Sequence, residues 1–198
     1  MKNQHIISVG GDELRYTDAG SGNVVLFLRP MLNNPLADEL AVNFRVIGVE
    51  VGDGKAPKVS KGLGSLLTHL GVSRYSLIAG SELASAAVAH AIESGDSVEA
   101  LVLIAPMSGV SNGASADLAL EDVNAPTLVL FGTRDQMVAP ESGRIFARRI
   151  SKCFYTLVYD SGHDIATDRP QALCAVVGAF LKHREKFVVQ HESSVINP

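Results

Sequence analysis

Apolar residues along the chain gather into eight short segments, separated by turn residues or by stretches with helical spacing. Continuous apolar runs, which are typical of parallel strands buried on both faces, lie at 24–28, 45–51, 100–105 and 127–131. The remaining segments are Ile6–Val9, Glu13–Asp18, Tyr75–Ala79 and Phe154–Tyr159. The first two alternate weakly around Gly10–Gly11, so we expect them to pair as an antiparallel hairpin.

Helical spacing predicts helices between the later strands, at 63–70, about 82–93, 141–150 and 170–183. Strands that alternate with helices indicate an α/β fold with a mostly parallel, eight-stranded, doubly wound sheet and helices on both faces. In such sheets, ligands bind beyond the carboxyl ends of the strands. We expect one domain over 1–198, with a loose tail from about Arg184.

Composition narrows the function classes. The 198 residues are 46% hydrophobic, with a mean hydropathy of +0.19 and a net charge of −4, which argues against nucleic acid or an anionic membrane as partner. The N-terminal residues hold no apolar stretch long enough for a signal peptide or a membrane span, so a cytoplasmic protein is expected. Cys153 and Cys174 are expected to be reduced core residues.

Three residues with catalytic chemistry follow strand segments in the order Ser81, Asp135, His163. Each stands where a parallel strand is predicted to give way to a loop, so the three side chains should meet at one edge of the sheet. The other histidines and the cysteines show no metal-ligand spacing, and Gly52-Asp53-Gly54 lacks the features of a phosphate loop. We therefore expect neither a metal nor a cofactor.

The chain resembles the α/β-hydrolase superfamily from about Val9 to Leu181. The resemblance is carried by three stretches: YSLIAGSELASAAVAHAIESGDSVEALVLIAP, PTLVLFGTRDQMVAP and DSGHDIATDRPQALCAVVGAFL. They are similar to the family's nucleophile elbow, acid loop and histidine loop. The resemblance implies a catalytic triad with Ser81 as nucleophile, His163 as base and Asp135 as the acid that orients it.

The elbow departs from the family pattern G-x-S-x-G, because Ala79 and Leu83 replace the two outer glycines. Those positions are small in the family so that the strand and the helix can approach, and Leu83 is the more serious replacement. Ser85 would lie inside the helix, which leaves Ser81 as the candidate nucleophile.

The oxyanion loop departs as well, since Arg29-Pro30 stands where the family usually has His-Gly. The resemblance implies that the backbone amides of Met31 and Glu82 form the oxyanion hole. Arg29 is a candidate for binding a substrate carboxylate or phosphate, and the alternative is an ion pair that closes the loop.

The segment between Pro106 and Pro126 is too short for the helical lid of most family members, so we expect no cap domain. Met31, Met107 and Met137 all fall on loops at strand ends, and we predict that they form an apolar substrate-binding rim around Ser81. Ordinary core filling is the alternative for each of them. An exposed rim of this kind would also be compatible with a homodimer.

The leading hypothesis is a lidless serine hydrolase that cleaves a small-molecule ester or thioester through an acyl-enzyme. A second hypothesis is a non-catalytic hydrolase-fold protein that binds a small molecule or a protein, motivated by Leu83 and Arg29-Pro30. Non-hydrolytic chemistry on the same scaffold, such as acyl transfer, lyase or isomerase action, is a third.

Overall fold

The computed structural model describes residues 4–9, 12–29, 34–51, 56–107, 119–187 and 195–196. These residues form one nine-stranded sheet, in the order β1-β2-β4-β3-β5-β6-β7-β8-β9. The strands are β1 (Gln4–Val9), β2 (Asp12–Ala19), β3 (Val24–Arg29), β4 (Arg45–Glu50), β5 (Tyr75–Gly80), β6 (Val98–Ile104), β7 (Thr127–Gly132), β8 (Cys153–Val158) and β9 (Val195–Ile196).

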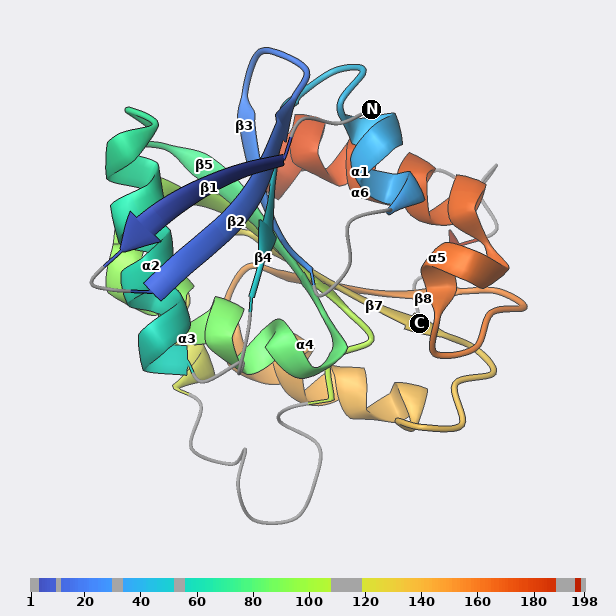
Figure 1. Cartoon of the computed structure of the whole chain (residues 1–198). Helices are drawn as coiled ribbons and strands as arrows, with labels where there is room; N and C mark the ends of the chain where they lie inside the picture. The colour runs from blue at the N-terminus through green and yellow to red at the C-terminus, as the bar shows by residue number, and fades with distance from the viewer. Residues whose placement is uncertain are drawn as a thin grey trace.

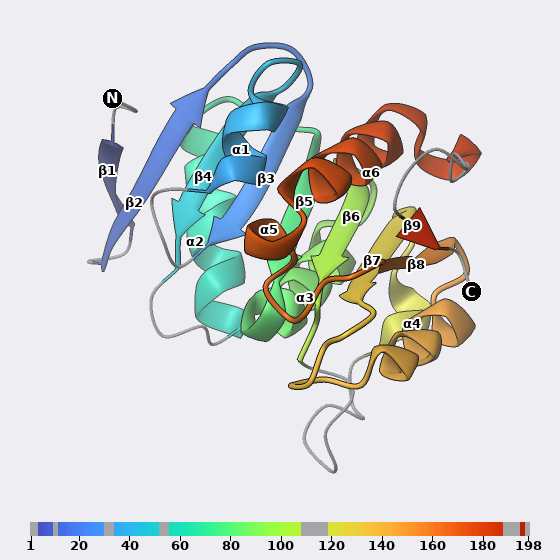
Figure 2. The same cartoon turned by 90° about the vertical axis from the view of Figure 1, so that its right-hand side faces the viewer.

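The strand directions confirm the predicted α/β architecture. β1 and β2 pair in antiparallel fashion and β2 continues antiparallel onto β4, whereas the pairs from β4 through β3 to β8 are parallel. The eight predicted strands are all present, and the two-residue β9 adds an antiparallel edge beside β8 (Figure 2). β7 is buried at every position, as its continuous apolar run indicates.

Helices cover both faces of the sheet (Figure 1). Residues of α2 (Ala56–His69), α3 (Ala84–Ser94) and α4 (Arg144–Arg149) pack in one apolar layer. Residues of α1 (Pro35–Leu40), α5 (Ile165–Asp168) and α6 (Pro170–His183) pack in the other. Short 3₁₀ turns complete the described helical elements: η1 (Ser81–Leu83), η2 (Gly95–Ser97), η3 (Leu120–Asp122), η4 (Pro140–Gly143) and η5 (Arg184–Lys186).

Helix boundaries differ from the sequence-based expectation in several places. The bounds of α6 are confirmed, but α2 begins at Ala56 rather than near 63, and α1 and α5 were not expected. Both unexpected helices are too short to show a helical period. Each has a capping signal instead, because the side chains of Asn34 and Asp164 accept backbone N–H groups of the first turn.

The first residues of the predicted tail, which begins at about Arg184, contact the packed structure. The Arg184 guanidinium donates to Glu99 at 2.6 Å, and Phe187 is buried. The ring of Phe187 packs edge-on against Phe154 and Phe180, with 5.5 Å between centroids in each pair. Residues 184–187 are therefore part of the packed structure. Within the described residues, no helix is long and apolar enough to cross a membrane.

A buried polar cluster lies between α2 and α3, centred on His90. Ser60 donates its proton to the acceptor-only carboxylate of Glu93, so its oxygen accepts from His90 Nδ1–H, 2.8 Å away. His90 Nε2 then accepts from the Tyr75 hydroxyl at 2.6 Å. The neutral imidazole is thus satisfied at both nitrogens, and its burial lowers the pKa of His90 below the ordinary value of 6.5.

This cluster predicts a loss of stability in mild acid. His90 takes up a proton near pH 6.5 when the chain is unfolded but resists protonation when folded, so the unfolded state binds more protons below that pH. We expect the free energy of unfolding to fall between pH 7 and 5, and His90→Gln to flatten that slope by at most about 1.4 kcal/mol per pH unit. Urea titrations at several pH values measure it. His69→Gln, on the exposed side of α2, should retain the wild-type slope, and an unchanged slope in His90→Gln would exclude His90 as the cause.

Candidate active site

The three candidate side chains lie just beyond the carboxyl ends of three parallel strands. Ser81 follows β5 directly, Asp135 lies in the loop after β7, and His163 lies in the loop after β8. Because β5 to β8 run parallel, these strand ends face the same edge of the sheet. Residues far apart in the sequence are thereby brought together, as the strand pattern predicts.

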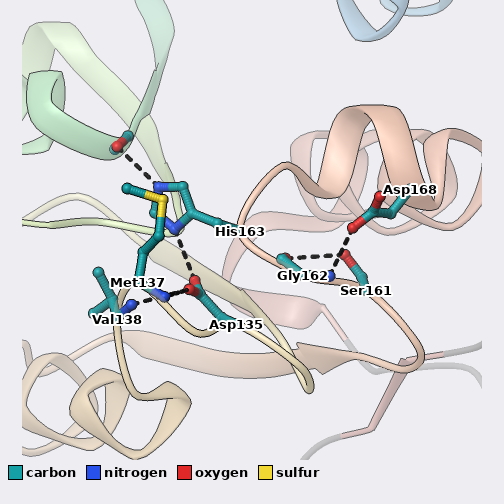
Figure 3. A network of polar contacts seen from close by, with 8 residues as sticks. Asp135, Met137, Val138, Ser161, Gly162, His163 and Asp168 are labelled. Carbon is teal, nitrogen blue, oxygen red and sulfur yellow. Dashed lines mark hydrogen bonds and ion pairs between the residues drawn. The ribbon is translucent and has the colours of Figure 1, made fainter.

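A continuous chain of hydrogen bonds joins the three side chains (Figure 3). The distance from Ser81 Oγ to His163 Nε2 is 3.1 Å, and that from His163 Nδ1 to Asp135 Oδ2 is 2.8 Å. Since the Asp135 carboxylate can only accept, we assign the ring proton to Nδ1. The lone pair on Nε2 then faces the Ser81 hydroxyl and is placed to take its proton.

Asp135 is held by its own loop as well as by the histidine. Its Oδ1 accepts the backbone N–H groups of Met137 and Val138, both at 2.9 Å, which leaves Oδ2 for the imidazole (Figure 3). The Asp135 side chain has an exposed fraction of 0%, whereas that of His163 is 18%. The acid is therefore enclosed, and the imidazole retains access to the solvent side.

The elbow keeps its strained turn in spite of Leu83. Ser81 has a φ of +44°, in the left-handed region that side chains other than glycine rarely adopt. Ala79 and Leu83 are both buried in the apolar layer beneath α2 and α3. Ser81 is the first residue of the single 3₁₀ turn η1, which leads into α3, and this helix begins with Ala84 and also contains Ala86 and Ala87. Ala84, Ala86 and Ala87 are buried in the same apolar layer as Leu83, and the contact between Ser81 and His163 is present.

The acid loop (132–138) and the histidine loop (159–164) are bonded to each other. Arg134 N–H donates to the Ser161 carbonyl at 2.8 Å, and Asp160 N–H donates to Thr133 Oγ1 at 3.0 Å. The side chains of Arg134 and Asp160 form an ion pair. A Cβ atom on Gly132 would overlap the carbonyl oxygens of Ser161 and Gly162, so only glycine allows the two loops to pass this closely.

Gly132→Ala should consequently push the histidine loop away from the acid loop. We expect a loss of about 1 to 3 kcal/mol in the free energy of unfolding, because the obstructing atoms belong to the backbone. Gly64→Ala is the matched control, because nothing lies within 4 Å of its added methyl group and it sits in helix α2. That variant should gain up to about 1 kcal/mol. If chemical denaturation showed the same change in the free energy of unfolding for both variants, the close approach at Gly132 would be contradicted.

An apolar cavity of about 250 Å³ opens beside Ser81. Ser81, Glu82 and His163 contribute polar groups to its wall, and no lysine or arginine lines it among the residues that the structure describes. Asn34 and Asp164 add polar atoms where α1 and α5 begin. The apolar part of the wall consists of Phe27, Leu28, Leu36, Leu83, Ile104, Ala105, Ile165, Ala166 and Leu173.

The other predicted site residues fall in several places. Met107 is 37% exposed and donates its N–H to the Ser81 carbonyl at 3.2 Å. Met137 is 66% exposed, and Figure 3 shows its side chain extending from the acid loop toward the imidazole of His163. Both lie near the candidate site, but neither lines the cavity. Glu82 is exposed at the beginning of η1.

Two predicted features lie at the limit of the described residues. Pro30 and Met31 fall outside them, and Arg29 is described only through its backbone at the end of β3. The role of Arg29 in substrate binding and that of the Met31 amide stay predictions. No group of three or more His, Cys, Asp or Glu residues able to hold a metal ion occurs in the part of the chain that the structure covers.

The residues that sequence reasoning missed are the cavity residues on α1, α5 and the start of α6. Leu36, Ile165, Ala166 and Leu173 come together only when these helices pack over one face of the sheet. The signal that could have located α1 and α5 is a capping residue directly before the helix start: Asn34 before Pro35, and Asp164 before Ile165.

Comparisons with known proteins agree with this architecture. No protein-family model matches the chain, and no curated protein matches it. Among solved structures, a thermophilic esterase from Thermogutta terrifontis is 18% identical with a TM-score of 0.80, over 91% of this chain and 98% of that one. Carboxylesterase CesB from Bacillus subtilis is 14% identical with a TM-score of 0.80, over 91% and 92%. The serine hydrolase CarC of carbazole degradation is 16% identical with a TM-score of 0.79, over 92% and 99%. The chain has the α/β-hydrolase fold.

Proposed function

We propose that the chain is a serine hydrolase that cleaves carboxylic esters or thioesters through an acyl-enzyme. The observation that carries the proposal is the unbroken hydrogen-bond chain from Ser81 Oγ through His163 to Asp135. Such an arrangement pairs a weak nucleophile with a base whose tautomer is fixed by a third group. The printed names of the similar structures, an esterase, a carboxylesterase and a serine hydrolase, support the same reaction class.

In the proposed reaction, Ser81 Oγ attacks the acyl carbon while its proton passes to His163 Nε2. The imidazolium then gives that proton to the departing alcohol or thiol, and the acyl group stays on Ser81 as an ester. Water, deprotonated by the same imidazole, attacks this ester; the imidazolium then returns the proton to the departing Ser81 Oγ, and the carboxylic acid leaves. Asp135 keeps the ring proton on Nδ1 throughout and stabilises the imidazolium by charge.

The negative oxygen of the tetrahedral intermediate needs donors aimed at it. The amide of Glu82 is our first candidate, because it lies in the opening turn of η1, where N–H groups have no partner within the helix. The second candidate is the amide of Met31, which follows β3 in the chain. Pro30 lacks an N–H of its own but leaves the one on Met31 in place.

The cavity beside Ser81 suggests the acyl group. Its wall is mainly apolar, and the charged residues on it, Glu82 and Asp164, are acidic, which disfavours an anionic acyl chain there. Its volume of about 250 Å³ is small beside the roughly 300 to 1,000 Å³ of most small-molecule sites. We therefore propose a short to medium-length, uncharged acyl chain as the preferred substrate part.

A fluorophosphonate probe tests the proposed nucleophile. Wild-type protein should form a covalent adduct on Ser81, detected by intact and peptide mass spectrometry, and should hydrolyse p-nitrophenyl esters. Ser81→Ala should abolish both, and Asp135→Asn should lower kcat by about 10⁴-fold because the ring proton is no longer fixed on Nδ1. Ser85→Ala, one helical turn further on, should label like the wild type. A folded wild-type protein with neither adduct nor turnover would favour the binding function without catalysis.

Acyl-chain selectivity tests the cavity separately. Ala166→Leu adds volume to the cavity wall, so kcat/KM for long p-nitrophenyl esters relative to the acetate should fall about tenfold. Ala175→Leu makes the same substitution on the exposed side of α6 and should keep the wild-type chain-length profile. Identical profiles for the two variants would show that the acyl chain does not enter this cavity.

A further inference from the structure

The histidine loop is fixed from two directions, and the two sets of contacts meet at Gly162. Up to Ser161, the loop is held by the acid loop, through Thr133 and Arg134. From His163 onward, the backbone enters α5, with Ile165 N–H donating to the His163 carbonyl at 3.1 Å. The peptide group between Ser161 and Gly162 therefore joins a part held by the sheet to a part held by a helix.

The side chain of Asp168 binds the backbone at this peptide group. Its Oδ2 accepts the Gly162 N–H at 2.7 Å, a short bond of the kind formed with a charged acceptor (Figure 3). A Cβ atom on Gly162 would lie 3.2 Å from the same oxygen, so the carboxylate packs directly on this backbone. Asp168 is the last residue of α5, two positions before α6 begins at Pro170.

We propose that Asp168 is a positioning residue for His163, acting through the Gly162 amide; this inference rests on the proposed function, in which His163 is the base. The Gly162 N–H belongs to the peptide group between Ser161 and Gly162, so its bond to Asp168 Oδ2 fixes the backbone one peptide group before the Cα that carries the imidazole. The imidazole must satisfy Asp135 at 2.8 Å and Ser81 at 3.1 Å together. A displacement of about 1 Å at a reacting group can cost about 100-fold in rate.

The neighbouring polar residues of α5 have a different role. Asp164 accepts from the Thr167 N–H at 3.2 Å and from its hydroxyl at 2.7 Å, which caps the helix without a contact to Gly162. Removing the Thr167 hydroxyl thus weakens the same helical turn but leaves the Asp168 bond in place. Thr167→Ala is therefore the control that separates an effect on the stability of α5 from an effect on the position of His163.

The experiment compares Asp168→Ala, Asp168→Asn and Thr167→Ala in the 198-residue chain. Asp168→Ala should lower kcat for a p-nitrophenyl ester about tenfold or more, with KM changed less than about twofold, because the substrate wall is intact. Asp168→Asn retains an oxygen that can accept from Gly162 N–H and should recover most of the rate. Thr167→Ala should keep the wild-type kcat. The rate of fluorophosphonate labelling at Ser81 should follow the same order.

A second measurement does not depend on catalysis. The Nδ1 proton of His163, hydrogen-bonded to Asp135, should give a downfield proton NMR signal that shifts or broadens in Asp168→Ala and is retained in Asp168→Asn and Thr167→Ala. A variant Asp168→Ala with wild-type kcat and an unchanged ring signal would overturn the proposal, whatever its melting temperature. If the wild type neither labels nor turns over, the hydrolase function fails, and the ring signal alone then decides the role of Asp168.

Discussion

The close approach of two loops at Gly132 is the constraint on which the candidate site depends. A side chain at this position would overlap the backbone of the histidine loop, and the glycine allows Arg134 and Thr133 to bond that backbone directly. The bond between Asp135 and His163 is therefore formed between parts that are already in contact, so little additional ordering is needed to make it. Asp168 extends the same principle to the far side of the loop by holding Gly162. Backbone contacts on both sides hold the loop that carries His163, in addition to the bond between its imidazole and Asp135.

The predictable part of the structure is the part in which local pattern and burial coincide. Strands β3 to β8 are parallel and mostly buried, and such strands must be apolar almost throughout. Their positions can therefore be predicted from continuous apolar runs in the sequence. The order Ser81, Asp135, His163 after three of these strands was enough to place the side chains at one edge. No family model or curated protein matches the chain, yet these few positions identify the fold because they are tied to strand ends.

What the sequence could not show depends on contacts between distant segments. Leu83 is a serious departure from the elbow pattern, yet it is buried in one apolar layer with the small residues at the start of α3, and this packing is evident only in the folded structure. The cavity wall is built from α1, α5 and α6, of which the first two are too short to carry a period. The packing of Phe187 against Phe154 and Phe180 likewise joins the residues that follow α6 to β8 and to α6 itself. In each case the missing information is a tertiary contact rather than a local preference.

The three polar side chains of the site differ in burial: that of Asp135 is enclosed, whereas His163 and Ser81 are partly exposed. The Asp135 side chain has no exposed surface, and its two oxygens accept from Met137, Val138 and His163, so Oδ2 loses its partner if the imidazole moves away. That requirement opposes any movement of His163 away from the acid. Ser81 has the longer contact, 3.1 Å, and lies partly exposed on a strained turn beside the cavity. Under the proposed function, we expect adjustment to a bound substrate at the Ser81–His163 contact, with the acid and the imidazole moving as one unit.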